Sequence, residues 1–267
     1  MGMGGAYTAA ANDVYSLIWN PAGLTQVKSQ QASVFYTKQF SLIPYSMAAY
    51  SNSFGNSNWN HGEAVLVSGD DALRETVVYF GIGYKADRFL KNLSFGINLK
   101  YKNVSFGNNE SGGEGQITGN ALGLGIDMGA LYKIHDKITT GLAIKNVFDK
   151  VSWNSSSMGN YTQNNPLRVV VGLALHISEN HLIVFDFEKS LHLDTANRLN
   201  VGTERTFFNI LSVRGGAFQN LVPLAEINYN LGLGVRYSQL GKDLSLDAAY
   251  VIRDIENTVK LSLTLDF

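Results

Sequence analysis

The sequence predicts an all-β chain, a 14-stranded antiparallel transmembrane β-barrel with an N-terminal segment inside its lumen. Nearly all of the chain from residue 31 onward alternates apolar and polar residues, which is the period of a strand with two different faces. No run approaches the roughly 18 apolar residues of a membrane-spanning helix. Small residues dominate the start of the chain, so we expect a hatch segment at 1–28 and a barrel at 29–267.

Composition restricts the class of protein. Charged residues make up 16% of the 267 positions, below the roughly 25% that is usual for soluble domains. The net charge of -1 offers no basic face for nucleic acid. Cysteine is absent, which excludes disulfide frameworks and thiolate metal sites. No signal peptide is visible, and the sequence is therefore interpreted as a mature or trimmed form.

The first expected element is the hatch segment, which small residues open and a turn sequence closes. Its candidate gating residues are Gly2, Gly4, Gly5, Ala6, Asn12, Asp13, Asn20, Pro21, Ala22 and Gly23. Together with Tyr7, Thr8 and Trp19, this pattern resembles the amino-terminal signature of FadL-like outer-membrane proteins, in particular the branch containing PorV, PorQ and spirochaete relatives. In that family the segment is a hatch inside a fourteen-stranded barrel. The other interpretation is a glycine-rich leader before a soluble β domain.

A series of alternating segments follows the hatch. In residues 227–238, for example, Ile227 and Leu231 share one face, whereas Asn230 and Gly234 share the other. About fourteen segments are long enough to cross a bilayer when tilted, and an even number of strands suits a closed bacterial barrel. The expected strands are 31–41, 45–53, 60–68, 76–86, 92–106, 119–134, 137–148, 166–177, 181–189, 196–206, 209–219, 226–238, 243–253 and 257–267.

Connection lengths support the same architecture. Tight connections at 135–136, 178–180, 207–208 and 240–242 alternate with longer ones at 107–118, 149–165, 190–195 and 220–225. Outer-membrane barrels have short periplasmic turns and longer extracellular loops, which places the last residue, Phe267, in the periplasm. A terminal aromatic on the last strand resembles the signal that the barrel-assembly machinery reads, so Phe267 is the expected assembly signal.

The period alone does not say which face points outward. A soluble lipocalin-like barrel would bury its apolar face. Here the polar face is rich in glycine and poor in charge, which favours lipid on the apolar face and a lumen on the polar one. The candidate polar residues of the lumen are Lys100, Arg168, Glu204, Arg214 and Arg236. They are interpreted either as a network that holds the hatch or as a site for the head group of an amphipathic solute.

Signatures of enzymes are missing. The five histidines have no metal-ligand spacing, and no nucleophile elbow, phosphate loop or dinucleotide fingerprint is present. Asp186 and Glu188 share the polar face of one strand, and paired carboxylates can do acid–base chemistry. On a barrel they more often pair with interior Arg or Lys, because an unpaired buried charge is costly. We therefore expect no enzyme activity, no metal and no cofactor.

The resemblance implies a monomeric protein of the bacterial outer membrane that passes hydrophobic, fatty-acid-like small molecules. It also implies passage when the hatch shifts or through an opening in the barrel wall. The expected partners are outer-membrane lipid, a hydrophobic ligand and the barrel-assembly machinery, and no nucleic acid. One alternative is a PorV-like component of type IX secretion that accepts or shuttles secreted cargo. Another is a soluble β-barrel ligand binder.

Overall fold

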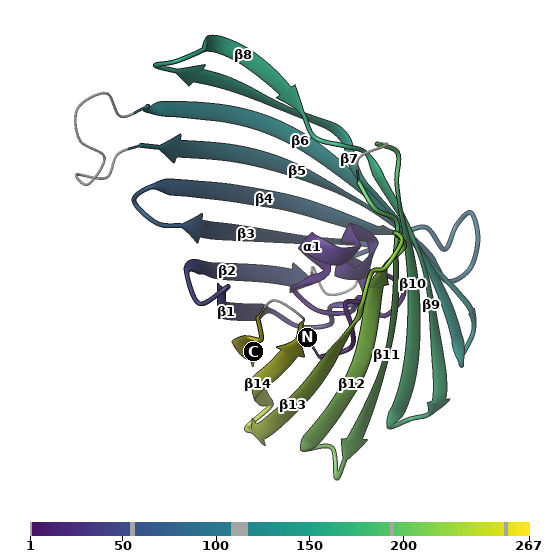
Figure 1. The fold of residues 1–267 in the computed structure, drawn as a ribbon. Coiled ribbons are helices and arrows are strands. Elements are labelled where there is room, and N and C mark those ends of the chain that lie inside the picture. The colour runs from purple at the N-terminus through teal and green to yellow at the C-terminus, as the bar shows by residue number, and fades with distance from the viewer. Residues whose placement is uncertain (1, 54–56, 108–116, 193–194, 254–255) are drawn as a thin grey trace.

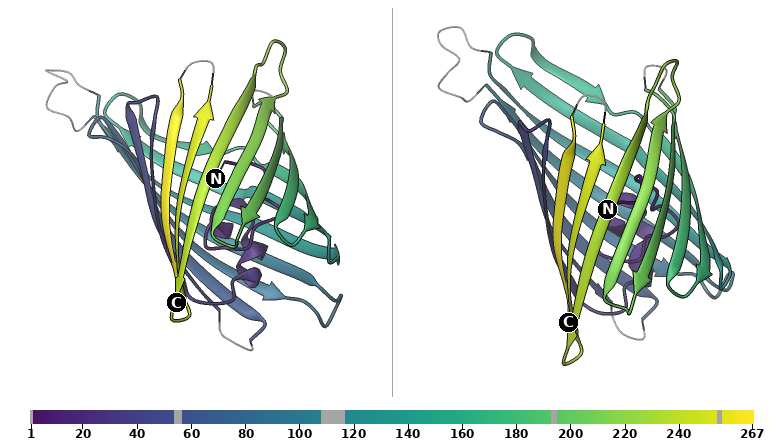
Figure 2. Two further views of the ribbon diagram at one scale, coloured as in Figure 1. Left: turned by 90° about the horizontal axis from the view of Figure 1, so that it is seen from below. Right: turned by 60° about the horizontal axis from the view of Figure 1, so that its bottom comes forward.

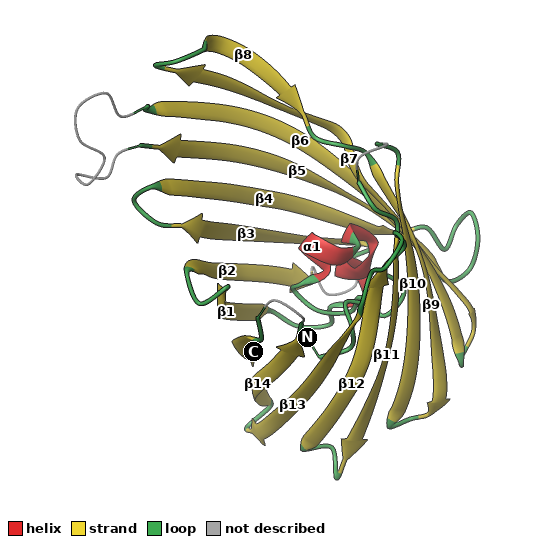
Figure 3. Ribbon diagram, in the orientation of Figure 1, coloured by secondary structure: helices red, strands yellow, loops and turns green. Residues whose placement is uncertain are grey.

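The computed structural model describes residues 2–53, 57–107, 117–192, 195–253 and 256–267. They form a β-barrel with a short helical segment inside it (Figures 1 and 3). The helices are α1 (Ser16–Trp19) and the 3₁₀ helix η1 (Pro21–Gln26). The strands are β1 (Gln31–Gln39), β2 (Ile43–Ser53), β3 (Trp59–Gly69), β4 (Leu73–Lys85), β5 (Leu93–Phe106), β6 (Gly119–His135), β7 (Ile138–Ser155), β8 (Gly159–Asn164), β9 (Arg168–Ser178), β10 (His181–Ser190), β11 (Arg198–Phe207), β12 (Leu211–Asn220), β13 (Ile227–Gln239), β14 (Lys242–Ile252) and β15 (Thr258–Asp266).

The sheet closes on itself. In the described residues it has 15 strands, all paired antiparallel, and β1 pairs with β15 through Gln31 opposite Asp266. Because β8 pairs only with β7, and β7 pairs onward with β9, the closed ring consists of the other fourteen strands. The predicted fourteen-stranded antiparallel barrel is confirmed.

The stretch at 149–165 was wrongly predicted to be a loop. Strand β7 continues through it to Ser155 and turns into β8, with Trp153 opposite Tyr161. The resulting hairpin projects past the end of β9 (Figure 1). Its outward face is polar, whereas Val151 and Trp153 lie on the inward face and pack with Val104 and Ala121. The hairpin therefore lacks the apolar outward face that identifies the barrel strands. Most of the other long connection predicted, 107–118, lies outside the described residues.

The predicted sorting of the connections holds only in the second half of the barrel. In the first half, three residues connect β1 to β2 at 40–42 and β3 to β4 at 70–72, at the same end as the long connections. The seven-residue connection at 86–92 lies at the opposite end. The prediction that every other connection is tight is therefore wrong before residue 107.

The apolar face of the strands points outward, as predicted. On β13, Leu231 and Leu233 are 57% and 56% exposed, whereas Gly232 and Gly234 between and beside them are buried against the interior. The same alternation recurs on β15, where Leu261 and Leu263 point outward and Ser262 is buried. The interior polar face lines the lumen.

Residues 2–28, here called the amino-terminal segment, lie inside the barrel (Figure 2). The segment begins against β12 and β13, where Gly2 contacts Gly232, and it reaches β5 and β6, where Ala22 and Asn20 contact Gly96 and Gly129. These walls are nearly opposite in the ring, so the segment crosses the lumen. Among the described residues no helix has the length and apolarity needed to cross a membrane.

Candidate functional site

Asn20 organises the end of the amino-terminal segment. Its side chain is fully buried and donates from Nδ2 to the carbonyl oxygens of Thr8, at 2.9 Å, and Ala130 on β6, at 3.1 Å. Its Oδ1 accepts the backbone N–H of Ala22 at 3.2 Å and caps η1, which opens with Pro21. One amide thus joins both halves of the segment to the barrel wall.

Polar side chains of the wall bind the backbone of the segment. Asp186 on β10 accepts the N–H groups of Tyr7 and Thr8, both at 2.9 Å. Asn60 on β3 donates to the carbonyl oxygens of Leu24, at 2.7 Å, and of Val27, at 2.8 Å. These bonds satisfy backbone groups that would otherwise be buried without partners.

Asn98 on β5 extends this set by donating to the carbonyl oxygen of Leu17. Glu188, two residues after Asp186, instead pairs with Arg168 at 2.8 Å. The two carboxylates of β10 therefore serve as a backbone acceptor and an ion-pair partner.

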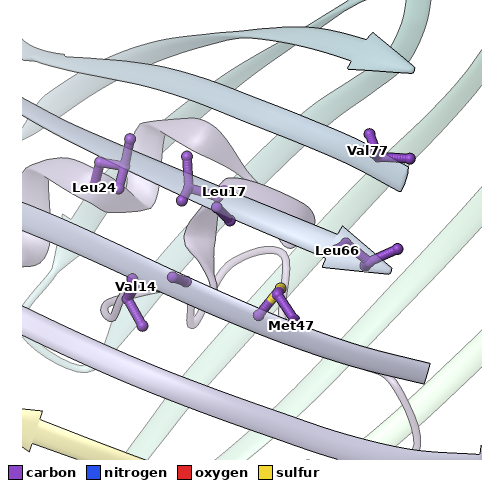
Figure 4. Close-up of a cluster of buried hydrophobic side chains, with 8 residues drawn as sticks. Val14, Leu17, Leu24, Met47, Leu66 and Val77 are labelled. Atoms are coloured by element: carbon purple, nitrogen blue, oxygen red, sulfur yellow. The ribbon is translucent and has the colours of Figure 1, made fainter. Parts of the chain in front are cut away.

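Apolar contacts reinforce the polar ones. Val14, Leu17 and Leu24 of the segment pack with Met47 on β2, Leu66 on β3 and Val77 on β4 (Figure 4). On the other wall, a second cluster joins residues of the segment's first turn to Ala174 and Val184. The segment is therefore packed against the wall at both ends.

Glycines let the segment approach the wall closely. A Cβ on Gly129 would lie 2.0 Å from Oδ1 of Asn20, and a Cβ on Gly96 would lie 2.2 Å from the carbonyl carbon of Pro21. Within the segment, Gly4 has φ +61°, and a Cβ there would lie 2.4 Å from the carbonyl oxygen of Ala217. No larger residue fits at these three contacts.

A cavity of about 490 Å³ remains beside the segment. The amino-terminal segment forms one side of it with Tyr7, Asp13 and Ile18, and strands β1–β3 and β10–β15 form the rest. Its apolar wall includes Phe35, Tyr45, Met47 and Leu66, and its polar wall includes Glu204, Arg214, Asp247, Lys260 and Asp266. A volume in this range suits a small organic molecule.

Arg214 is the centre of the polar wall, because it bonds both Glu204 and Asp247. Across the cavity, Asp13 accepts the N–H of Tyr15 at 2.9 Å. Burial raises the pKa of the Asp13 carboxyl to about 6, and burial also raises the pKa of the neighbouring Tyr7 hydroxyl. The amino-terminal segment thus carries an acid that titrates near neutrality.

The predicted lumen residues do not form one cluster. Lys100 lies away from the cavity, on the wall of β5–β7, where its Nζ is 2.7 Å from Asp127 and 3.0 Å from Asp149. Arg168 pairs with Glu188 on the wall of β9 and β10, and Glu204, Arg214 and Arg236 face the cavity. Arg236 is exposed near the end of β13.

Comparison with solved structures places this arrangement in a known fold. The CymD monoaromatic hydrocarbon channel superposes with a TM-score of 0.69 at 16% identity, over 100% of this chain and 96% of that one. A FadL homologue of Pseudomonas aeruginosa gives 0.70 at 12% identity, over 97% and 95%. The chain has a FadL-type fold. The toluene transporter TodX of Pseudomonas putida gives 0.67 at 14% identity, over 96% and 94%. No family model matches the sequence, and no curated protein matches it significantly.

In this FadL-type barrel, the predicted gating residues form two separate groups. Gly2, Gly4 and Gly5 lie against β11–β13, and Ala6 packs with Ala174 and Val184 of β9 and β10. Asn20, Pro21 and Ala22 lie against β5 and β6, whereas Gly23 packs against Ala11 within the segment. Between them, Asn12 accepts the Tyr7 hydroxyl at 2.8 Å, and both Asn12 and Asp13 border the cavity. The two groups therefore lie at opposite sides of the lumen, where the amino-terminal segment meets the barrel wall.

Asn60 and Asn98 were not among the predicted site residues, and Asp186 was expected to pair with an interior Arg or Lys rather than to hold the segment. The sequence feature that could have identified these three residues is their position on the inward face of a strand, next to or near interior glycines. No group of three or more His, Cys, Asp or Glu side chains in the described residues could hold a metal ion.

Proposed function

We propose that the protein is a channel of the bacterial outer membrane that admits hydrophobic small molecules. The observation that carries the proposal is a closed barrel with an apolar exterior and, inside it, a cavity bounded by the amino-terminal segment. Two proteins of the same fold carry the names of a monoaromatic hydrocarbon channel and a toluene transporter. Those names support the same class of solute here.

The exterior supports a location in lipid. Leu231, Leu233, Leu246 and Leu261 are each between 45% and 57% exposed on the outer face, and similar residues recur around the ring. Removing one large apolar side chain from water contributes roughly 1.5–3 kcal/mol. Covering dozens of them with lipid therefore contributes on the order of tens of kcal/mol, whereas soluble monomers rarely expose so large an apolar surface.

The proposed route leads through the cavity. A hydrophobic solute contacts the apolar wall at Phe35, Tyr45, Met47 and Leu66, while the amino-terminal segment closes the other side. Because the segment crosses the lumen, passage needs a shift of this segment or an exit through the wall. Such gating by a small rearrangement at a packed contact is common in proteins.

The wall has one place suited to a lateral exit. The ladder between β7 and β9 runs from Ile138 opposite Leu175 to Lys145 opposite Arg168. From Lys150 to Ser155, β7 pairs with β8 instead, and in the described chain β8 pairs with β7 alone. The strand ladder on this side of β7 is therefore interrupted at residues 146–149.

Replacing Asn20 and Pro21 together by alanine tests the proposed gate. It removes the bonds to Thr8 and Ala130, and each buried polar group left unpaired costs about 1–3 kcal/mol. We expect saturable uptake of toluene by proteoliposomes to fall about tenfold or more, because the displaced segment no longer forms the cavity wall.

The matched control is Gln26→Ala with Lys28→Ala, since both side chains are exposed in the same segment. Heat-modifiable migration on a gel, boiled against unboiled, establishes that each barrel is assembled. Unchanged saturable uptake in an assembled Asn20→Ala/Pro21→Ala barrel contradicts the proposal.

We propose a role in secretion as a second candidate. The specific observation is the free edge of β8, whose residues Gly159–Asn164 are all exposed. An unpaired strand edge can accept an added strand from another chain. A secreted cargo protein that pairs in this way would fit the PorV-like branch, which the segment at residues 19–24 resembles.

The two functions are separated by capture of a secreted protein's carboxy-terminal domain. The secretion role predicts capture by the full chain and its loss when residues 152–163 are replaced by a short turn. That change leaves the β7–β9 ladder in place, and it leaves the β6–β7 ladder in place up to Gly123 opposite Val151. Equal capture by both proteins, or none by the full chain, contradicts the secretion role.

A further inference from the structure

The seven-residue connection at 86–92 is a folded element at the end of the barrel that carries Phe267. The side chain of Asp87 accepts the N–H of Asn92 at 2.8 Å and closes the connection on itself. The carbonyl oxygen of Asn92 accepts the N–H of Lys133, at the end of β6, at 3.2 Å. The connection therefore projects from the barrel in a defined shape beside β6 (Figure 1).

The connection starts just beyond a pair of aromatic side chains on the outer face. Trp59 on β3 lies opposite Tyr84 on β4, and their ring centres are 4.5 Å apart. Both point outward, because Asn60 and Gly83 beside them contact the amino-terminal segment. Aromatic side chains of outer-membrane barrels gather where the lipid tails meet the head groups. In a bilayer, residues 86–92 would therefore lie at the level of the head groups.

Large apolar side chains are exposed beyond this aromatic pair. Phe89 is 83% exposed and Leu90 is 47% exposed, and Ile134 at the end of β6 is 54% exposed. Phe89 and Leu90 lie outside the strands, so the lipid-facing wall of the barrel does not account for them. Since the connection holds these side chains away from the rest of the chain, only another molecule can remove them from water.

Cationic side chains accompany the apolar ones. Residues 85–92 and 133–137 contain five cations and two carboxylates, which gives a formal charge of +3 in a chain whose net charge is -1. Asp136 already pairs with Lys133 at 2.8 Å. Within the described residues, three of the cations form no ion pair, namely Arg88, Lys91 and Lys137. The excess charge is therefore free to meet an anion.

The other half of the same end lacks this combination. Its connections at 179–180, 208–210 and 240–241 contain no cationic residue. Phe208 and Leu240 are 90% and 94% exposed there, but no cation shares their turns. The cations thus gather on one side of this end of the barrel. We call the exposed residues of that side the rim patch: Arg88, Phe89, Leu90, Lys91 and Ile134.

We propose that the rim patch binds the head group of an anionic phospholipid in the adjoining leaflet. Arg88 and Lys91 contact the phosphate, and Phe89 and Leu90 lie against the glycerol and the upper acyl chains. Cations combined with large apolar side chains are typical of segments that bind anionic membrane surfaces. Lipid is favoured over a protein partner because the rim patch adjoins the outward aromatic pair. The inference goes beyond the passage of solutes and rests on the proposed location in lipid.

The test measures binding of two lipids with identical acyl chains to the detergent-solubilised full chain by native mass spectrometry. Dioleoylphosphatidylglycerol has an anionic head group and dioleoylphosphatidylcholine a zwitterionic one. Because each cation near a membrane surface strengthens binding of an anionic lipid about fivefold, we expect wild type to bind the phosphatidylglycerol about tenfold or more tightly. Arg88→Gln with Lys91→Gln should reduce this preference to about twofold or less. Phe89→Ala should weaken binding of the phosphatidylglycerol about threefold or more.

Phe208→Ala and Lys242→Gln are the matched controls. Both side chains are exposed at the same end of the barrel but lie on other hairpins, so neither replacement should change the preference. Arg88→Lys keeps the charge and should keep most of the preference. Added salt should reduce the preference of wild type, because it screens exposed charges. Heat-modifiable migration verifies that each barrel is assembled.

The outcomes separate this inference from the channel proposal. If wild type binds both lipids equally, the inference fails, a protein becomes the occupant of the rim patch, and the channel proposal stands. A preference that survives Arg88→Gln with Lys91→Gln places the anionic lipid elsewhere on the barrel and also overturns the inference. If neither lipid binds, the inference falls together with the proposed location in lipid.

Discussion

Asp13 shows how one residue makes the amino-terminal segment sensitive to pH. Its carboxyl borders the cavity, and burial raises its pKa from the ordinary 3.8 to about 6. In the unfolded chain the group loses its proton near pH 4, but in the folded protein it holds the proton until about pH 6. The stabilising contribution of the protonated form is therefore present below about pH 4, is lost between 4 and 6, and stays absent above 6.

Asp13→Asn removes this dependence while keeping an oxygen for the N–H of Tyr15. We expect the variant to melt a few degrees above wild type at pH 8, where a difference of 1 kcal/mol corresponds to about 2–4 °C. At pH 4 the two proteins should melt together. The measurement is a pair of thermal melts at each pH, and equal melting at pH 8 would contradict the raised pKa.

At the scale of elements, interior glycines determine where the segment can lie. Gly129 on β6 faces the lumen, and only its missing side chain leaves space for Asn20. The same holds at Gly96 on the neighbouring strand. The strands themselves need no glycine there, since the barrel ladder is formed by backbone groups.

Gly129→Val should displace the segment and leave the ring closed. Its Cβ would enter the space of Oδ1 of Asn20, and overpacking of this kind costs about 1–3 kcal/mol. The expected result is faster proteolysis within residues 2–28 at an unchanged heat-modifiable gel shift. Gly215→Val on β12 is the control, since a Cβ there meets only Thr203, at 4.0 Å. Equal protection of the segment in both variants would refute the packing role.

The β7–β8 hairpin shows where prediction of elements failed. The alternation of apolar and polar residues identified the strands of the ring, because successive side chains of a strand face the apolar exterior and the polar lumen in turn. Above Lys150 the outward face of the hairpin is polar and its apolar residues, Val151 and Trp153, face inward, so the apolar outward face of the ring strands is absent although the backbone ladder continues. Strand pairing without an apolar outward face does not match the pattern that identified the other strands.

At the scale of the whole molecule, the apolar outer face of the barrel determines whether lipid or water surrounds it. Leu233 is 56% exposed on the outer face near the middle of β13. If lipid covers this face, Leu233→Arg should destabilise the inserted barrel by about 2–4 kcal/mol. Leu240→Arg, in a turn where Leu240 is already 94% exposed, should have almost no effect. Urea titration of both variants folded into vesicles measures the difference, and equal midpoints would place β13 outside lipid.

The sequence by itself determined the number of ring strands, their approximate bounds and the outward direction of the apolar face. These properties follow from alternation along each strand, which is local and repeats many times. The amino-terminal motif also predicted a hatch, and the structure places residues 2–28 in the lumen.

Only the tertiary structure decided what holds that segment and which side chains meet inside the barrel. Asp186 meets Tyr7 across 179 positions of the chain, and Asn98 meets Leu17 across 81. Arg198 and Arg253 meet at the ring of Phe218 from two different strand ends. Such contacts depend on ring closure and strand register, which bring together residues that are distant in the sequence. The local alternation of apolar and polar residues does not show which residues will meet.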